Sequence, residues 1–140
     1  MKVFIDSNIP MYVAGQEHPN RAPSLRFLAR VKSGEIEVCA STEVLQEILY
    51  RYSAIGRPDL AGEVYDLFVG ICPVVLPVTL ADTDRARELL RAVAGISARD
   101  AVHAAVMLNH GIQSIATFDS GFDRVPGIRR ANLQLPTYFA

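Results

Sequence analysis

The strongest constraint on the fold is an alternation of short apolar runs with longer amphipathic segments. The runs, rich in Val, Ile and Phe, are residues 3–5, 36–40, 74–78 and 114–118, with a weaker one at 128–131. Apolar residues at helical spacing fill the segments between them, at 8–13, 24–34, 42–55, 58–69, 82–94 and 97–109. Strands that alternate with helices form a parallel sheet with helices on both faces. The sequence therefore predicts an α/β protein with three layers, α/β/α, around a central, mainly parallel sheet of four to five strands.

Composition narrows the class of protein further. The chain has 140 residues, 50% of them hydrophobic and 21% charged, which predicts a single globular domain over residues 1–140. The net charge of −1 excludes a strong overall basic field of the kind that attracts nucleic acid. Cys39 and Cys72 lack metal-ligand spacing and are expected to be small buried side chains. Because neither a signal peptide nor a membrane span is recognisable, we expect a cytoplasmic protein without membrane contact.

Four of the fifteen acidic residues lie near the ends of predicted strands or the starts of predicted helices: Asp6, Glu47, Asp100 and Asp119. Asp6 and Asp119 each follow an apolar strand directly. Ligands of open parallel sheets bind outside the carboxyl ends of the strands, and acids gathered there repel one another unless a cation joins them. Oxygen ligands of this kind favour Mg²⁺ or Mn²⁺, so the spacing indicates a divalent-metal site.

Local structure offers a simpler explanation for several of these acids. Asp6-Ser7-Asn8 can form a strand-ending turn through side-chain bonds to the backbone. Ser97 and Asp100 have the spacing of a helix-capping box. A phosphotransfer site of the haloacid-dehalogenase type would require a second Asp where Asn8 stands.

The position of a residue on its predicted helix indicates whether it can be a metal ligand. Glu47 borders the apolar stripe of its helix and can reach a cleft, although it can equally pair with Arg51 one turn later. Glu43 lies farther from that stripe and suits the positive end of the helix dipole. Asp82 also falls at a helix start, which explains it without a metal. A lone histidine such as His103 is more often a packed core residue than a ligand.

Four segments together resemble the PIN-domain family, especially the VapC-like ribonuclease toxins. They are Val3-Phe4-Ile5-Asp6-Ser7-Asn8-Ile9, Glu43-Val44-Leu45-Gln46-Glu47-Ile48-Leu49, Ala98-Arg99-Asp100-Ala101-Val102-His103-Ala104-Ala105 and Ala116-Thr117-Phe118-Asp119-Ser120-Gly121-Phe122-Asp123. The resemblance implies that Asp6, Glu47, Asp100 and Asp119 form a catalytic, metal-binding site, and that Asp123 is an auxiliary ligand. It also implies that Ser7 and Thr117 support this site by hydrogen bonding.

The resemblance further implies a Mg²⁺- or Mn²⁺-dependent endoribonuclease that hydrolyses RNA, with a small antitoxin protein as partner and a homodimeric state. Family members often have Thr at the position of Ser7 and charged residues at Ser120-Gly121. Because the net charge is low, positively charged side chains close to the site must supply the contacts with RNA. The candidates by sequence proximity are Arg99, Arg124, Arg129 and Arg130.

Two other functional classes remain open at this point. A receiver-like phosphotransfer domain needs an Asp at the end of the third strand, and Val74-Val75-Leu76-Pro77-Val78-Thr79 offers none. A non-catalytic or housekeeping RNA-binding module of the same fold would have less reason to retain all four acids, because clustered like charges cost stability.

Overall fold

The structure of the protein, a computed structural model, describes residues 2–139. Its strands are β1 Lys2–Ile5, β2 Glu37–Ser41, β3 Val74–Leu76, β4 Ser114–Ala116 and β5 Arg129–Ala131. Its helices are α1 Asn8–Ala14, α2 Arg21–Lys32, α3 Thr42–Ala54, α4 Pro58–Ile71, α5 Leu80–Ala92 and α6 Ala98–Asn109, and a 3₁₀ helix, η1, spans Ser120–Arg124. Within the described residues, no helix is long and apolar enough to cross a membrane.

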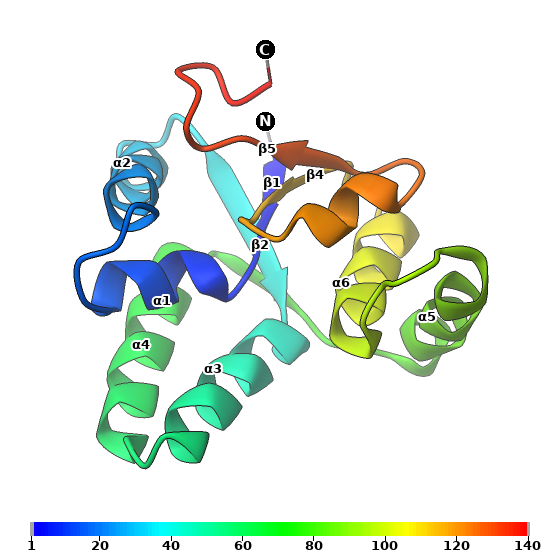
Figure 1. The fold of residues 1–140 in the computed structure, drawn as a ribbon, viewed down its shortest axis with the longest axis horizontal. Helices are drawn as coiled ribbons and strands as arrows, with labels where there is room; N and C mark the ends of the chain where they lie inside the picture. Colours follow the sequence, from blue (N-terminus) through cyan, green and yellow to red (C-terminus); the bar gives the residue numbers. More distant parts are fainter. Residues whose placement is uncertain (1, 140) are drawn as a thin grey trace.

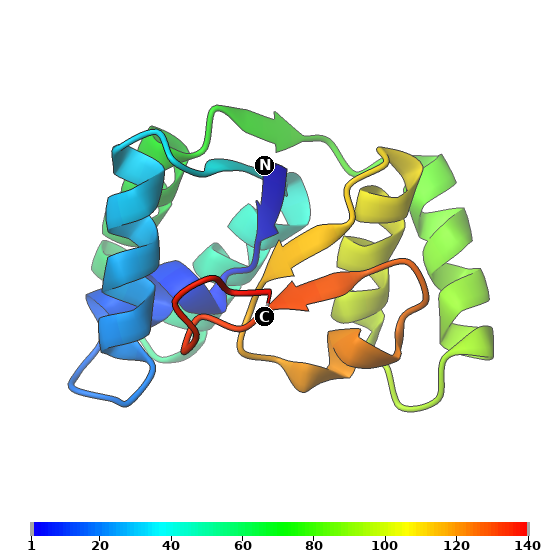
Figure 2. The ribbon, with the colours of Figure 1, turned by 90° about the horizontal axis from the view of Figure 1, so that it is seen from above.

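The five strands form one parallel sheet in the order β3-β2-β1-β4-β5. β1 lies at the centre, with Phe4 paired to Cys39 of β2 on one side and to Ile115 of β4 on the other. Helices α1 to α4 lie on one side of the sheet, and α5 and α6 lie on the other (Figures 1 and 2). This arrangement confirms the predicted three-layer α/β fold, including the weaker fifth strand.

The boundaries of several elements differ from the sequence prediction. β3 ends at Leu76 rather than at Val78, and Pro77, which has no backbone N–H to donate, follows it directly. α2 begins at Arg21, three residues before the predicted start at Ser24, and includes Pro23. Proline is tolerated there because the first N–H groups of a helix have no intrahelical acceptor.

The start of α5 also differs, since the helix begins at Leu80 rather than at Asp82. The Thr79 hydroxyl caps the helix by accepting from the Asp82 backbone N–H, and the Asp82 carboxylate accepts from the Thr79 backbone N–H in return. This capping box confirms that Asp82 has a structural role.

The core lies between the sheet and the helices around four fully buried phenylalanines, Phe4, Phe27, Phe68 and Phe122. Both cysteines are buried and unpaired, as predicted. Two apolar residues of the predicted helices 24–34 and 42–55, Leu25 and Ile55, are not part of this core, since they are 41% and 53% exposed. Leu25 lies beside the buried stripe of α2, and Ile55 lies beyond the last residue of α3, where the helical spacing no longer applies.

The central position of β1 determines where a ligand can bind. From β1, the next strands in the chain, β2 and β3, are added on one side, and the later strands, β4 and β5, are added on the other side. In parallel α/β sheets, ligands bind outside the carboxyl ends of the strands where the strand order reverses in this way. The carboxyl ends of β1 and β4, followed by Asp6 and Thr117, mark this position.

Candidate active site

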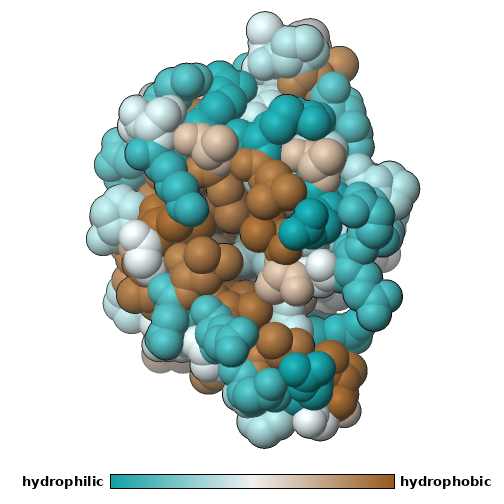
Figure 3. All heavy atoms as spheres, turned by 90° about the vertical axis from the view of Figure 1, so that its left-hand side faces the viewer, coloured by the Kyte–Doolittle hydropathy of each residue, from teal (hydrophilic) through white to brown (hydrophobic). Residues whose placement is uncertain are grey.

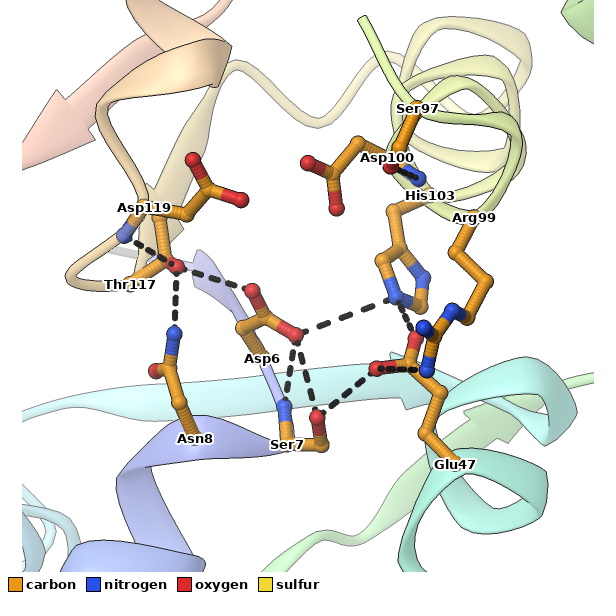
Figure 4. Close-up of polar contacts among 10 residues, drawn as sticks. All are labelled: Asp6, Ser7, Asn8, Glu47, Ser97, Arg99, Asp100, His103, Thr117 and Asp119. Carbon is orange, nitrogen blue, oxygen red and sulfur yellow. Dashed lines mark hydrogen bonds and ion pairs between the residues drawn. The ribbon is translucent and has the colours of Figure 1, made fainter. Parts of the chain in front are cut away.

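An acidic pocket of about 240 Å³ opens at the carboxyl ends of β1 and β4. Side chains from α3, α6 and the segments that follow β1 and β4 converge on it (Figure 4). Its lining residues are Asp6, Ser7, Asn8, Glu47, Ser97, Arg99, Asp100 and Asp119. All four acids predicted from the sequence are therefore brought together, although they are up to 113 positions apart in the chain (119 − 6).

Asp6 lies at the floor of the pocket and is 5% exposed. Its backbone N–H continues the ladder to β4 by donating to the Ala116 carbonyl at 3.1 Å. Its Oδ1 accepts from the Ser7 N–H at 2.7 Å, and its Oδ2 accepts from the Thr117 hydroxyl at 2.8 Å. Burial raises the pKa of Asp6, and the nearby Glu47 charge raises it further, against the opposing effect of His103.

Thr117 connects three parts of the site through one hydroxyl. Besides donating to Asp6, its Oγ1 accepts from the Asn8 side-chain amide and from the Asp119 backbone N–H, both at 3.0 Å. The hydroxyl therefore fixes where the segment after β4 turns. This turn directs Asp119 to the rim of the pocket (Figure 4).

Glu47 extends from α3 and is held by two side chains. The Ser7 hydroxyl donates to its Oε2 at 2.9 Å, and the Nε2 of His103 makes a short hydrogen bond with its Oε1. Nε2 of His103 also lies 3.8 Å from Oδ1 of Asp6. Burial alone would raise the pKa of Glu47, but the contacts with His103 and Ser7 outweigh it, and the pKa is lowered.

His103 is completely buried between the two acids and the core. Its ring centroid lies 5.6 Å from that of Phe4 and 6.5 Å from that of Phe122. Burial disfavours the protonated imidazole, but the Glu47 hydrogen bond and the Asp6 charge prevail, so the pKa of His103 is raised. Contact with the two acids therefore favours the protonated imidazole more than burial alone would.

Asp100 and Asp119 face each other at the other side of the pocket (Figure 4). Only half of the predicted capping box forms: the Ser97 hydroxyl accepts from the Asp100 backbone N–H at 3.1 Å, and the Asp100 carboxylate is directed at the site instead. Burial and the neighbouring Asp119 raise the pKa of Asp100 to about 7. The neighbouring Asp100 carboxyl lowers the pKa of Asp119, whose Oδ1 also accepts from the Gly121 N–H at 2.8 Å.

Three residues expected near the site have other contacts. Asp123 does not line the pocket, because both of its carboxylate oxygens accept from Arg130, at 2.9 and 3.0 Å. Arg124 donates to the Ala94 carbonyl at 2.8 Å and thereby ties η1 to the loop before α6. Arg129 donates to the carbonyl of Phe139 at 2.9 Å.

Other predicted features are placed nearer to the acids. Arg99 lines the pocket, and its Nη1 lies 4.0 Å from Oε2 of Glu47. Among residues 2–139, the alternative ion pair between Glu47 and Arg51 does not form. Glu43 lies outside the acidic pocket and lines a neighbouring hollow.

The sequence reasoning missed the functional position of His103 and the contribution of Asn8. His103 is correctly a core residue, but it also contacts Glu47, and its spacing of three positions from Asp100 on one helix face is the signal that indicates this. Asn8 orients the Thr117 hydroxyl through its amide. No pattern in the sequence predicts that contact across 109 positions.

Comparison with known proteins supports the same assignment. The PIN-domain family model matches residues 3–128. Ribonuclease VapC13 of Mycobacterium tuberculosis is 42% identical over 128 residues, which cover 91% of this chain and 98% of the relative.

Solved structures of low sequence identity share the fold. One is Mycobacterium tuberculosis VapC20, described as a sarcin-ricin loop cleaving toxin, with a TM-score of 0.70, 23% identity and coverage of 84% of this chain and 90% of that one. Another is DNA-bound VapBC from Salmonella typhimurium, with a TM-score of 0.71, 21% identity and coverage of 95% and 98%. With the match to VapC13 over nearly its whole length, these findings show that the chain belongs to the PIN-domain family, among the VapC ribonucleases.

Proposed function

We propose that the protein is a divalent-metal-dependent endoribonuclease that acts as the toxin of a toxin–antitoxin pair. The observation that carries the proposal is the convergence of Asp6, Glu47, Asp100 and Asp119 on one pocket at the switch point of the sheet. The 42% identity to VapC13, which is named a ribonuclease, supports the reaction class. The proposed location is cytoplasmic, where RNA substrates are present.

The donor atoms fit a hard divalent cation. Ligand atoms of Asp6, Glu47 and His103 all lie within 4.8 Å of one another, and Asp100 and Asp119 add carboxylates at the rim of the same pocket. Carboxylate-rich sites of this kind suit Mg²⁺ or Mn²⁺. We propose Asp6, Glu47, Asp100 and Asp119 as the ligand set, and the pairing of Asp123 with Arg130 disfavours the auxiliary role first assigned to it.

The residues around the acids have defined tasks in this proposal. Ser7 and Thr117 fix the carboxylate of Asp6, while Ser7 and His103 fix that of Glu47, so that neither acid needs to reorient when the cation binds. A bound Mg²⁺ or Mn²⁺ would lower the pKa of a water molecule and neutralise charge that develops on the phosphate. Arg99, which is 60% exposed in its side chain at the pocket rim, is placed to contact a phosphate of the RNA.

A non-catalytic module with the same fold is a weaker explanation. The raised pKa values of Asp6 and Asp100 show that burial and mutual repulsion make these charges costly in the folded protein. A module that only binds RNA gains nothing from this arrangement. A nuclease gains a cation site.

An apolar face of the molecule suits a protein partner. The side formed by α1, α2 and α4 shows a continuous hydrophobic surface, bordered by polar residues (Figure 3). Leu25 of α2 and Val69 of α4 are 41% and 44% exposed. Patches of this kind mark protein–protein contacts, and several structures of the same fold are VapBC complexes. We therefore propose an antitoxin as the partner that covers apolar surface of the toxin.

The homodimer also remains a proposal. Helical spacing offers Leu49, Tyr52 and Leu67 as apolar surface for such a contact, and of these only Leu49 is exposed, at 44%. Tyr52 is buried and Leu67 is half-buried, so neither offers a largely exposed apolar side chain to a second copy. Sedimentation of the purified protein at several concentrations measures the oligomeric state directly.

A cleavage assay tests the proposed function. Purified protein is incubated with a panel of structured RNAs in Mg²⁺ or Mn²⁺, with EDTA in parallel, and Glu47→Gln serves as the inactive variant. We expect cleavage that needs the metal and is lost in the variant. Cleavage that persists in EDTA would contradict the metal-dependent mechanism. Growth arrest on expression, relieved by the product of the adjacent gene, tests the toxin–antitoxin assignment separately.

A further inference from the structure

A second hollow, of about 330 Å³, lies beside the acidic pocket and shares Arg99 with it. Its other lining residues are Glu43, Gln46 and Tyr50 of α3. Their spacing of three and four positions places them on one face of the helix, next to Glu47. A group bound in this hollow would therefore lie directly next to a substrate bound at the acids.

The side chains of the hollow are available for a ligand. Tyr50 is 55% exposed, which makes it a large aromatic side chain on the solvent side of α3. Within residues 2–139, the side chains of Glu43, Gln46 and Tyr50 make no hydrogen bond that meets normal geometry. A helix-start position explains Glu43, and solvation explains Gln46, but neither explains an exposed aromatic ring at the edge of the hollow.

The chemistry of the hollow favours a nucleobase over a phosphate. The Glu43 carboxylate repels a phosphate but accepts hydrogen bonds from amino and imino groups on a base edge. The Gln46 amide both donates and accepts, as base edges require. Tyrosine rings and arginine guanidinium planes are the groups on which unpaired RNA bases stack in proteins. The combination of two stacking groups, one carboxylate and one amide therefore matches a single extruded base.

We propose that Glu43, Gln46, Tyr50 and Arg99 form a subsite for one unpaired nucleobase that flanks the scissile phosphodiester bond. The subsite rests on the proposed ribonuclease function and specifies the part of the RNA that the enzyme reads. Arg99 joins the two pockets, since it can contact the phosphate on one side and the base on the other.

Sequencing the cleavage products of a randomised single-stranded oligoribonucleotide tests the subsite. In Mn²⁺, wild type is expected to show a base bias at one fixed position beside the cut. Tyr50→Ala should flatten this bias and lower kcat/KM by about 5- to 150-fold, the value of stacking one base. Tyr50→Phe should keep both, because it retains the ring. Glu43→Gln should change which base is preferred, because it replaces a carboxylate that only accepts hydrogen bonds by an amide that also donates them. Leu90→Ala truncates a side chain that is 45% exposed on α5, away from the hollow, and should match wild type.

A binding experiment separates this proposal from the proposed function. Fluorescence anisotropy measures the affinity of the same oligoribonucleotide for Asp119→Asn, with and without Tyr50→Ala. If wild type cleaves RNA but Tyr50→Ala keeps the bias, the rate and the affinity, the subsite is wrong and the ribonuclease function stands. If nothing is cleaved but Tyr50→Ala still weakens binding at least fivefold, the hollow binds a base, and the ribonuclease function and the place of the base beside a scissile bond are wrong. If Tyr50→Ala only converts a dimer into monomers in sedimentation, this face is a contact between copies and the subsite is overturned.

Discussion

Replacing Asp6 by Asn separates a metal-binding acid from one that only ends a strand, because Asn keeps the shape and removes the charge and one ligand oxygen. In the structure, Oδ1 of Asp6 accepts from the Ser7 N–H and Oδ2 accepts from the Thr117 hydroxyl. Asn retains one of these bonds. Its amide nitrogen would face a Thr117 hydroxyl that already accepts from Asn8 and from the Asp119 backbone.

Two opposing effects determine the stability of the metal-free variant. The lost hydrogen bond costs about 0.5–1.5 kcal/mol. Removal of a charge that burial and Glu47 disfavour stabilises the fold, since the raised pKa of Asp6 means that the charged form is less favourable in the folded protein than in the unfolded chain. At about 3–4 °C per kcal/mol for a chain of this size, loss of the hydrogen bond alone would lower the melting midpoint by at most about 5 °C. Because removal of the charge opposes this loss, the metal-free variant should melt at or above the wild-type midpoint.

The response to metal is the larger and more specific effect. A cation that binds only the folded state stabilises it by about 2.7 kcal/mol at a concentration of 100 Kd, which corresponds to an increase of about 8–10 °C in the melting temperature of wild type. If Asp6→Asn weakens binding about a hundredfold, the same concentration equals Kd, and the increment falls to about 0.4 kcal/mol, or about 1–2 °C. Thermal melts over a Mg²⁺ or Mn²⁺ series at one pH and ionic strength measure both increments.

Asp82→Asn is the matched control, because Asp82 is a buried, hydrogen-bonded acid outside the pocket. It should lower the metal-free midpoint by disrupting the capping box of α5 and leave the metal increment intact. An equal metal increment in wild type and Asp6→Asn, or no increment in either, would refute the assignment of Asp6 as a ligand.

Three further outcomes are expected from the geometry of the site. Because the pKa of Asp100 is raised from 3.8 to about 7, the folded protein binds this proton more tightly than the unfolded chain, and the contribution of Asp100 to metal-free stability falls as pH rises from about 4 through 7. Mn²⁺ affinity, measured calorimetrically, should rise up to about pH 7 and then level off, and Asp100→Asn should remove this pH dependence. His103→Leu should weaken Mn²⁺ binding about 10- to 100-fold, and His103→Gln should weaken it less, because glutamine can still donate to Glu47; equal losses in calorimetry would show that the hydrogen bond is not what matters. Asp123→Asn should leave the metal-dependent increase in melting temperature unchanged and cost at most about 1 kcal/mol, since its pair with Arg130 is at the surface; loss of that increase would restore Asp123 as a ligand.

The predicted fold agrees with the structure because it depends on patterns that local physics determines. Apolar runs such as residues 3–5 leave few alternatives to a buried parallel strand, and helical periodicity locates the segments that cover it. The boundaries were less accurate, since they depend on single contacts. The early start of α5 is one case, because the cap at Thr79 is recognised only when the Asp82 side chain is seen to turn back on it.

The four central acids could be predicted because each follows a strand or begins a helix, and the topology brings those positions to one edge of the sheet. The partners of the acids could not be predicted in the same way. The contact of His103 with Glu47 joins two helices that are 56 positions apart, and the Asn8 amide reaches Thr117 across 109. Such contacts depend on helix rotation and on side-chain rotamers, which no local pattern determines.

The two halves of the acidic pocket differ in how their charge is compensated. On one side, hydroxyl groups of Ser7 and Thr117 and the imidazole of His103 donate to the carboxylates, which are therefore held in place without a cation. On the other side, Asp100 lies next to Asp119, and burial together with this neighbouring carboxyl raises the pKa of Asp100 to about 7, so that Asp100 keeps its proton up to about neutral pH. A divalent cation can replace that proton, so the half of the site with the fewest protein donors is the half whose protonation should change when metal binds.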